Sequence, residues 1–185
     1  MPGGIIGITR RPTRREWRRA VLTFILGIAV VAAAILFIHP SQQLLPVGLA
    51  APPITLRDSG GRPVTVVPSP QQGPVVIEFF DTVCVSCQRE AATLCGIAAA
   101  NPAATVVGVD AGSESAAAVA AYARRSSPCA LPFLVDPNAK VSRSYAAAVV
   151  PTIYVVDRHG KIAYGGVGSS GIEAVSHNLQ RLVDG

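Results

Sequence analysis

Residues 75–87 read VVIEFFDTVCVSC, and they give the clearest indication of the fold class. Val75–Phe80 is a short apolar run with turn residues on both sides, which predicts a buried strand. From Cys84 to about Ala100 the residues favour a helix, and Asn101-Pro102 ends it. Two cysteines with two residues between them therefore stand where a buried strand gives way to a helix.

The rest of the chain extends this unit in both directions. Further strands are predicted at 105–109, 133–135, 152–156 and 162–164, further helices at 113–126, 139–147 and 171–183, and a hairpin at 54–56 and 64–67. This order predicts an α/β domain over residues 54–185. In that domain a central mixed sheet carries helices on both faces and is preceded by the hairpin.

Cys84 and Cys87 are predicted to form a redox-active pair. The N-terminus of a helix offers unpaired N–H groups and a partial positive charge, which stabilise a thiolate. We therefore expect Cys84 to be the nucleophile, with a lowered pKa, and Cys87 to resolve the mixed disulfide. The alternatives are a structural disulfide and half of a zinc site. A zinc site needs two more ligands, and His39, His159 and His177 lie far from the pair in this arrangement.

Cys95 and Cys129 are the remaining cysteines. We predict that they form a structural disulfide, which would stabilise the fold by about 3–4 kcal/mol for a loop of this length. Two alternatives stay open at this point: the pair could relay electrons, or both residues could be buried thiols.

Excess positive charge is confined to the N-terminus. The net charge is +5, and residues 1–19, with six arginines and Glu16, account for all of it. Because the remaining charges balance, no basic face is expected on the domain, and nucleic acid is excluded as a partner. Residues 20–38 follow as 19 uncharged, mostly apolar residues, about the length that spans a bilayer.

This pattern predicts a cytoplasmic basic segment at 1–19, a single transmembrane helix at 20–38 and a linker at 39–53, because arginines flank only one side of the apolar run. The domain would then lie outside the cytoplasm of a bacterial cell, anchored to the cell membrane, where disulfides persist. A cleaved signal peptide is the alternative. The run is long for one, and the first small-residue site, Gly48-Leu49-Ala50, lies well beyond its end.

Val150-Pro151-Thr152 stands at the start of the predicted strand at 152–156. With residues 47–56, 79–90 and 133–136, this stretch resembles the thioredoxin superfamily, and within it the membrane-anchored TlpA-like redoxins. The resemblance covers about residues 46–183. It implies a thioredoxin-like fold and a thiol–disulfide oxidoreductase without a cofactor. Its partners would be proteins with thiols or disulfides and an integral-membrane redox protein. It also implies that Pro151 is cis and, with Val150 and Thr152, faces the cysteines to bind substrate.

Glu78 and Glu90 are the predicted acid–base residues. Glu78 lies six residues before Cys84 in an apolar strand, where a carboxylate is costly unless it is neutral or partnered. The resemblance implies a buried proton acceptor for Cys87, with a pKa raised by desolvation; the alternative is a strand-end carboxylate that reaches solvent. Glu90, six residues after Cys84, matches a glutamate near the thiols of several TlpA-like reductases, or else is solvated on the helix surface.

Two other functions compete with disulfide exchange. A thiol peroxidase of the peroxiredoxin type needs a threonine three residues before the reactive cysteine, where this chain has Asp81. A copper chaperone has three residues between its cysteines and a histidine near the later strand, and neither is present, so no metal site is predicted. Val85-Ser86 lacks the family's proline, and Val83 replaces an aromatic residue, so both directions of electron flow stay open.

Overall fold

The computed structural model describes residues 13–38, 43–66 and 73–184. The chain divides into two compact units, Met1–Ser41 and Gln42–Gly185. In the first unit, helix α1 (Arg14–Ile38) begins after Thr13, whose N–H and hydroxyl donate to the Glu16 carboxylate at 2.7 and 2.8 Å. The Glu16 N–H donates back to the Thr13 hydroxyl at 3.3 Å, which completes a capping box.

The segment predicted to span a membrane, residues 20–38, lies within α1. Among the residues whose side chains are described, no helix combines the length and the apolar character that crossing a membrane requires. The transmembrane assignment is therefore not supported by the structure. Residues 34–38 of that segment, and 39–42 of the predicted linker, fall outside the described side chains.

Within the described part of the chain, the second unit is built on one sheet of seven strands, in the order β2-β1-β5-β4-β3-β6-β7. The strands are β1 Ile54–Asp58, β2 Pro63–Val66, β3 Val75–Phe80, β4 Thr105–Asp110, β5 Phe133–Val135, β6 Thr152–Val156 and β7 Ile162–Val167. At the centre, β3 pairs in parallel with β4 and antiparallel with β6. All six residues of β3 are buried, as expected for a strand covered on both faces. The predicted mixed sheet is confirmed.

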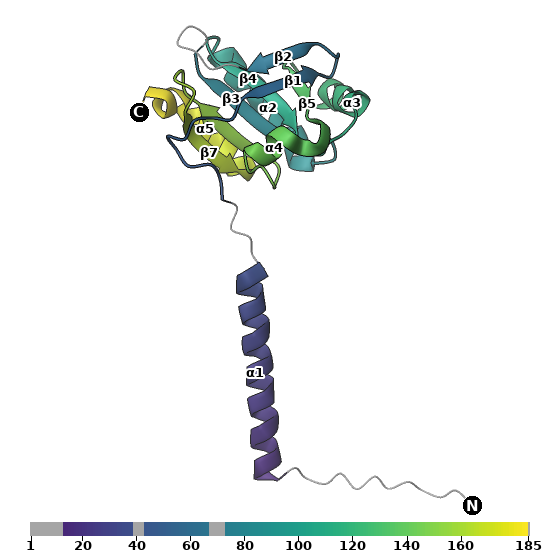
Figure 1. Cartoon of the computed structure of the whole chain (residues 1–185), viewed down its shortest axis with the longest axis vertical. Helices are drawn as coiled ribbons and strands as arrows, with labels where there is room; N and C mark the ends of the chain where they lie inside the picture. Colours follow the sequence, from purple (N-terminus) through teal and green to yellow (C-terminus); the bar gives the residue numbers. More distant parts are fainter. Residues whose placement is uncertain (1–12, 39–42, 67–72, 185) are drawn as a thin grey trace, which may run out of the picture. The chain divides into compact units, whose positions relative to one another are not determined.

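Helices cover both faces of this sheet. Val76 and Phe80 of β3 pack toward α2 (Val85–Ala100), α3 (Ala116–Ser126) and α5 (Gly168–Asp184). Val75, Ile77 and Phe79 point the other way, toward α4 (Lys140–Ser144), which follows the short 3-10 helix η1 (Pro137–Ala139). Figure 1 shows α3 beside β5 and α5 beside β7, on either side of α2. The alternation along β3 puts Glu78 on the α2 face.

The predicted bounds of β3, β5 and β6 are confirmed. The other bounds differ by one to three residues or more; the helix predicted at 113–126, for example, begins at Ala116, and the last helix begins at Gly168. Two of the differences have a clear structural reason. The predicted strand at 162–164 continues to Val167 through Gly165 and Gly166. A Cβ atom at Gly165 would lie 2.9 Å from the Tyr154 ring, so glycine serves here to let two strands pack closely. The predicted helix at 139–147 is shorter, because Ala146 adopts a φ of +52° and the chain leaves the helix there.

Candidate active site

Cys84 and Cys87 are joined by a disulfide at the start of α2, with their Cα atoms 5.3 Å apart. Cys84 is the N-cap residue, and its sulfur accepts a hydrogen bond from the Cys87 N–H at 3.1 Å. The Ser86 hydroxyl lies 3.3 Å from the same sulfur. These donors and the helix N-terminus would stabilise negative charge on Cys84 once the disulfide is reduced.

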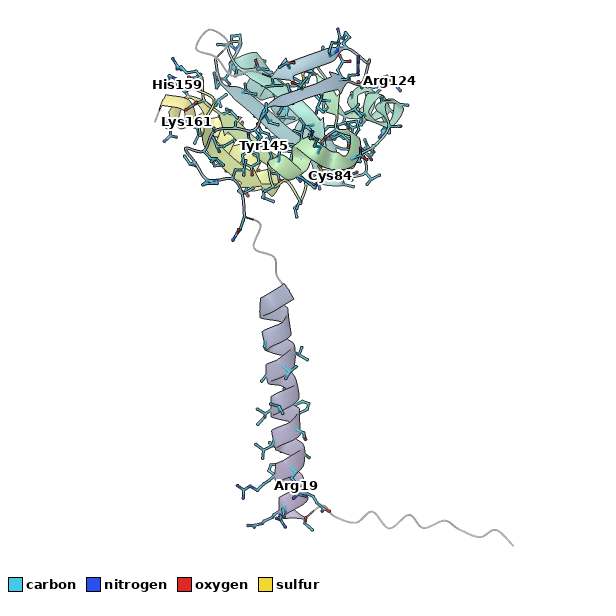
Figure 2. All side chains as sticks on the ribbon, viewed as in Figure 1. Arg19, Cys84, Arg124, Tyr145, His159 and Lys161 are labelled. Carbon is cyan, nitrogen blue, oxygen red and sulfur yellow. A yellow bond between two sulfur atoms is a disulfide. The ribbon has the colours of Figure 1, made fainter. Side chains whose placement is uncertain are left out.

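The two sulfurs differ in their exposure. Cys84 is half-buried, whereas Cys87 is fully buried in a cluster with Phe80, Val119, Tyr122 and Phe133. The Phe80 and Tyr122 rings stack with their centroids 4.5 Å apart. This cluster of four side chains forms a packed apolar wall behind the disulfide. In Figure 2, Cys84 lies well away from the turn that carries His159 and Lys161. Only Cys84 can be reached by a large partner.

The Val150–Pro151 peptide bond is cis, as the resemblance implied. Val150 is half-buried and packs against the same cluster that buries Cys87, so the structure brings this turn next to the disulfide. Thr152 is fully buried, and its hydroxyl donates to the Val149 carbonyl at 2.6 Å. The Thr152 side chain therefore stabilises the turn. Pro151 is buried as well, so Val150 is the one of the three predicted substrate-binding residues whose side chain can face a partner.

Glu78 is fully buried on the α2 face of β3. Among the described residues, neither of its carboxylate oxygens has a hydrogen-bond partner. Burial, reinforced by the charge of Glu90, raises the pKa of Glu78 to about 8. The alternative of a strand-end carboxylate that reaches solvent is therefore wrong, and Glu78 can take up or release a proton near neutral pH.

Glu90 is also buried, so the solvated alternative is wrong for this residue too. One of its oxygens accepts a hydrogen bond from the Ser169 hydroxyl of α5, and the other has no partner in the described structure. Burial raises the pKa of Glu90, and the Ser169 bond opposes that rise. The Tyr122 hydroxyl is buried without a described partner, and burial together with Glu78 and Glu90 raises the pKa of Tyr122. These three polar groups form one cluster, and its member Tyr122 packs in the wall that buries Cys87.

Cys95 and Cys129, which are 34 positions apart in sequence, form a second disulfide with their Cα atoms 5.9 Å apart. Cys95 is half-buried in α2, and Cys129 is exposed in the connection between α3 and β5. The Ser127 hydroxyl lies 3.4 Å from the Cys95 sulfur. This disulfide ties α2 to the α3–β5 connection, and it excludes the alternative of two buried thiols.

A second polar cluster precedes Cys84, and the sequence did not point to it. The Thr82 N–H donates to one oxygen of Glu114 at 3.1 Å, and the Thr82 hydroxyl donates to the other. Glu114 is held in turn by Asp110, because the Glu114 N–H donates to the Asp110 carboxylate at 2.7 Å. This cluster joins the loop after β3 to the loop after β4.

Asp110 is fully buried at the end of β4. Burial, reinforced by the Glu114 carboxyl and opposed by two backbone N–H bonds, raises the pKa of Asp110 to about 7. The available signal was the position of Asp81 and Asp110, each at the end of a strand predicted to be buried. Neighbouring parallel strands end at the same edge of a sheet, where functional groups gather.

Two grooves of about 500 and 530 Å³ share Leu56 and Pro137, and the lining of neither includes Cys84 or Cys87. In residues 13–38, 43–66 and 73–184, no three His, Cys, Asp or Glu side chains gather so as to hold a metal ion. The candidate site is thus a surface disulfide with buried acid groups behind it.

Comparisons with known proteins agree with this architecture. A model of the AhpC/TSA family matches residues 47–165. No curated protein sequence matches the chain. A candidate thiol:disulfide interchange protein, DsbE, from Chlorobium tepidum has a similar structure, with a TM-score of 0.66 and 22% identity over 75% of this chain and 98% of that one.

Two further solved structures are similar. The thioredoxin domain of a thiol-disulfide oxidoreductase from Bacteroides vulgatus matches with a TM-score of 0.62 and 22% identity, over 75% of this chain and 99% of that one. A secreted disulfide oxidoreductase from Mycobacterium tuberculosis, homologous to Escherichia coli DsbE, matches with a TM-score of 0.59 and 21% identity, over 69% and 95%. At such identities the likeness establishes the thioredoxin-like fold.

Proposed function

Since the chain belongs to the AhpC/TSA family and is a redox enzyme of the thioredoxin fold, we propose that it exchanges disulfides with protein partners through Cys84 and Cys87. The observation that carries the proposal is the Cys84–Cys87 disulfide at the start of α2, in which Cys84 is accessible and Cys87 is not. A nucleophile at the surface with a resolving thiol behind it is the arrangement that disulfide exchange requires.

The reducing direction runs in two steps. The Cys84 thiolate attacks one sulfur of a partner disulfide, forms a mixed disulfide with it, and the second partner sulfur leaves as a thiolate. Cys87 then loses its proton and attacks the Cys84 sulfur, which closes the enzyme disulfide and releases the first partner sulfur. Two electrons have then passed from the enzyme dithiol to the partner. The oxidising direction is the reverse of these steps.

Glu78 is the base that we assign to Cys87. The thiol of Cys87 is fully buried, so water cannot take its proton directly, and Glu78 lies on the same face of the sheet. Its carboxylate has no competing partner among the described residues, and burial raises its pKa to about 8. A base with a pKa near the working pH takes and returns a proton efficiently. Glu90 adjoins this base and connects it, through Ser169, to the exposed start of α5.

A polypeptide fits the surface around Cys84 better than a small molecule does. Val83 and Val85 are 78% and 65% exposed, and Val149 on the neighbouring turn is 41% exposed. Exposed apolar side chains around a reactive group are typical of a docking surface for another protein. The two grooves that share Leu56 and Pro137, which would suit a small ligand, lie elsewhere on the domain.

An anchored, extracytoplasmic location is the second part of the proposal. It rests on the six arginines that precede the uncharged run at 20–38, and on the two disulfides of the domain. The similar protein from Mycobacterium tuberculosis is secreted, which agrees with this location. An integral-membrane protein that recycles Cys84 and Cys87 would complete the pathway.

A trapping experiment tests the disulfide exchange. Replacing Cys87 with serine removes the attack that resolves the mixed disulfide, so partners should stay covalently bound to Cys84. The Cys84→Ser variant is the matched control and should trap none. The measurement is the amount of partner released by reductant on denaturing gels, with the linked cysteine identified by mass spectrometry. Trapping through Cys95 or Cys129 would reject the assignment of Cys84 as nucleophile.

Peroxide reduction is the competing function, because thiol peroxidases of the peroxiredoxin type also use a reactive cysteine on this scaffold. The position that would need a threonine holds Asp81, whose carboxylate accepts the Val83 N–H at 2.8 Å and is therefore occupied in the turn. We expect insulin disulfides to be reduced by the dithiol form and hydrogen peroxide to be turned over no faster than by the Cys84→Ser variant. Rapid, catalytic consumption of peroxide that requires Cys84 would favour the competing function.

A further inference from the structure

The turn between β3 and α2, residues 81–84, delivers Cys84 to the surface, and it is held from two sides. The N–H, hydroxyl and carbonyl groups of Thr82 all form hydrogen bonds with side chains outside the turn. Its N–H and hydroxyl donate to Glu114, and its carbonyl accepts from the Gln88 side chain at 3.1 Å. Within the turn, the Cys84 N–H donates to the Asp81 carbonyl at 3.1 Å.

Glu114 comes from a different part of the chain, 32 positions after Thr82. It lies in the loop between β4 and α3, directly before the N-cap residue Ser115. The two loops approach each other so closely that a Cβ atom at Gly112 would lie 3.0 Å from an Asp81 oxygen and 3.1 Å from the Glu114 carboxyl carbon. The Glu114 side chain therefore bridges two closely packed loops, the β3–α2 turn and the β4–α3 loop, which follow the carboxyl ends of two parallel strands.

We propose that Glu114 is a positioning residue for the Cys84 nucleophile: by holding Thr82 it fixes the turn that sets the Cys84 sulfur over the first N–H groups of α2. Asp110 keeps Glu114 in place through the N–H of Glu114. The inference rests on the proposed function, because it concerns the nucleophile of that reaction. It adds a residue from the β4–α3 loop to a site otherwise built from β3, α2 and the Pro151 turn.

Two effects of Glu114 on Cys84 have opposite signs, which makes them separable. Holding the turn keeps the Cys84 sulfur 3.1 Å from the Cys87 N–H, and this favours the thiolate. The negative charge of a carboxylate nearby disfavours the thiolate. The titratable and charged groups around the pair come from each element packed against it: Glu78 of β3, Asp81 of the turn, Arg89 and Glu90 of α2, Asp110 of β4, Tyr122 of α3 and Glu114 itself.

The experiment measures alkylation of Cys84 by iodoacetamide in the reduced full chain between pH 5 and 9. Glu114→Ala should slow the reaction at pH 7 by roughly tenfold and raise its midpoint pH, because a loosened turn no longer aligns the sulfur. Glu114→Gln should stay within about twofold of the wild type, because an amide can still bind both polar groups of Thr82. Asp157→Ala is the matched control: Asp157 also holds a turn, through the His159 and Lys161 N–H groups, but at the far end of β6.

Thr82→Val serves as a second variant should Glu114→Ala fail to fold, since it removes the hydroxyl and keeps the shape of the side chain. It should slow alkylation in the same direction as Glu114→Ala, whereas Thr82→Ser should restore the rate. An unchanged rate and midpoint in Glu114→Ala and Thr82→Val would overturn the inference. So would a faster reaction in both Glu114→Ala and Glu114→Gln, because that outcome assigns the whole effect to charge.

The wild type separates this inference from the proposed function. If Cys84 is not the rapidly alkylated cysteine in the wild type, or if the reduced wild type does not reduce insulin disulfides, the proposed function fails and the inference falls with it. If the wild type passes both measurements and Glu114→Ala matches it, the proposed function stands and the positioning role alone is rejected.

Discussion

Glu78 and Cys87 are both fully buried between β3 and α2, and their burial couples the proposed chemistry to stability. Burial raises the pKa of Glu78 from 4.5 to about 8. Below pH 4.5 the carboxyl is protonated in both the folded and unfolded protein. Between these values the unfolded state loses the proton while the folded state keeps it, so stability falls as pH rises toward 8. The full effect is on the order of 5 kcal/mol.

The Glu78→Gln variant should therefore show a flatter dependence of stability on pH than the wild type. Urea unfolding at intervals from pH 4.5 to 8.5 measures this slope, which is independent of the constant cost of burying an amide. The same variant should reduce insulin disulfides more slowly at pH 7, because Cys87 has lost its base. Equal slopes in the two proteins would mean that Glu78 is not the buried acid that gains a proton on folding.

Helix α2 is the element on which both disulfides depend. Cys84 caps it, Cys87 lies in its first turn, and Cys95 lies two turns further along. The second disulfide ties α2 to the α3–β5 connection, whose Leu131 packs against the cluster that buries Cys87. The second disulfide therefore links two of the segments that surround Cys87, helix α2 and the α3–β5 connection.

A double replacement of Cys95 and Cys129 by alanine should lower the free energy of unfolding by about 3–4 kcal/mol, because a cross-link over this span of chain restrains the unfolded state. Alkylation of Cys84 and trapping by the Cys87→Ser variant should remain. The measurement is urea unfolding of the oxidised proteins beside the alkylation rate. If turnover is lost while the fold and the Cys84 reactivity persist, the second pair relays electrons.

The sequence predicted those elements whose signal is local. The apolar run at Val75–Phe80 and the cysteines that follow it specify a strand, a turn and a helix start, and the structure has all three. Glu78 could also be assigned, because one carboxylate in an apolar run stands out. Glu114 could not, since in sequence it is an ordinary acidic residue at the start of a helix. Its bond to Thr82 depends on how two loops, 32 residues apart, meet in space.

The two units of the chain have different predicted environments. A reporter enzyme that is active only outside the cytoplasm, fused after Gly185, should be active, because the arginines precede the apolar run at 20–38. Fusion of a reporter that is active only inside the cytoplasm is the paired control and should be inactive. Alkaline carbonate extraction of membranes then separates a retained anchor, which stays with the pellet, from a cleaved segment, which leaves the domain in the supernatant.

The arrangement of cysteines along α2 also has a consequence for how a newly made chain matures. Four cysteines can pair in three ways, and only one of these leaves the enzyme competent. Cys84 and Cys87 are 3 positions apart, whereas Cys95 and Cys129 are 34 apart. Closing the shorter loop costs less chain entropy, so we expect the local pair to close first during biogenesis. Once that pair has closed, Cys95 can pair only with Cys129, so this order of closure favours the correct oxidised form.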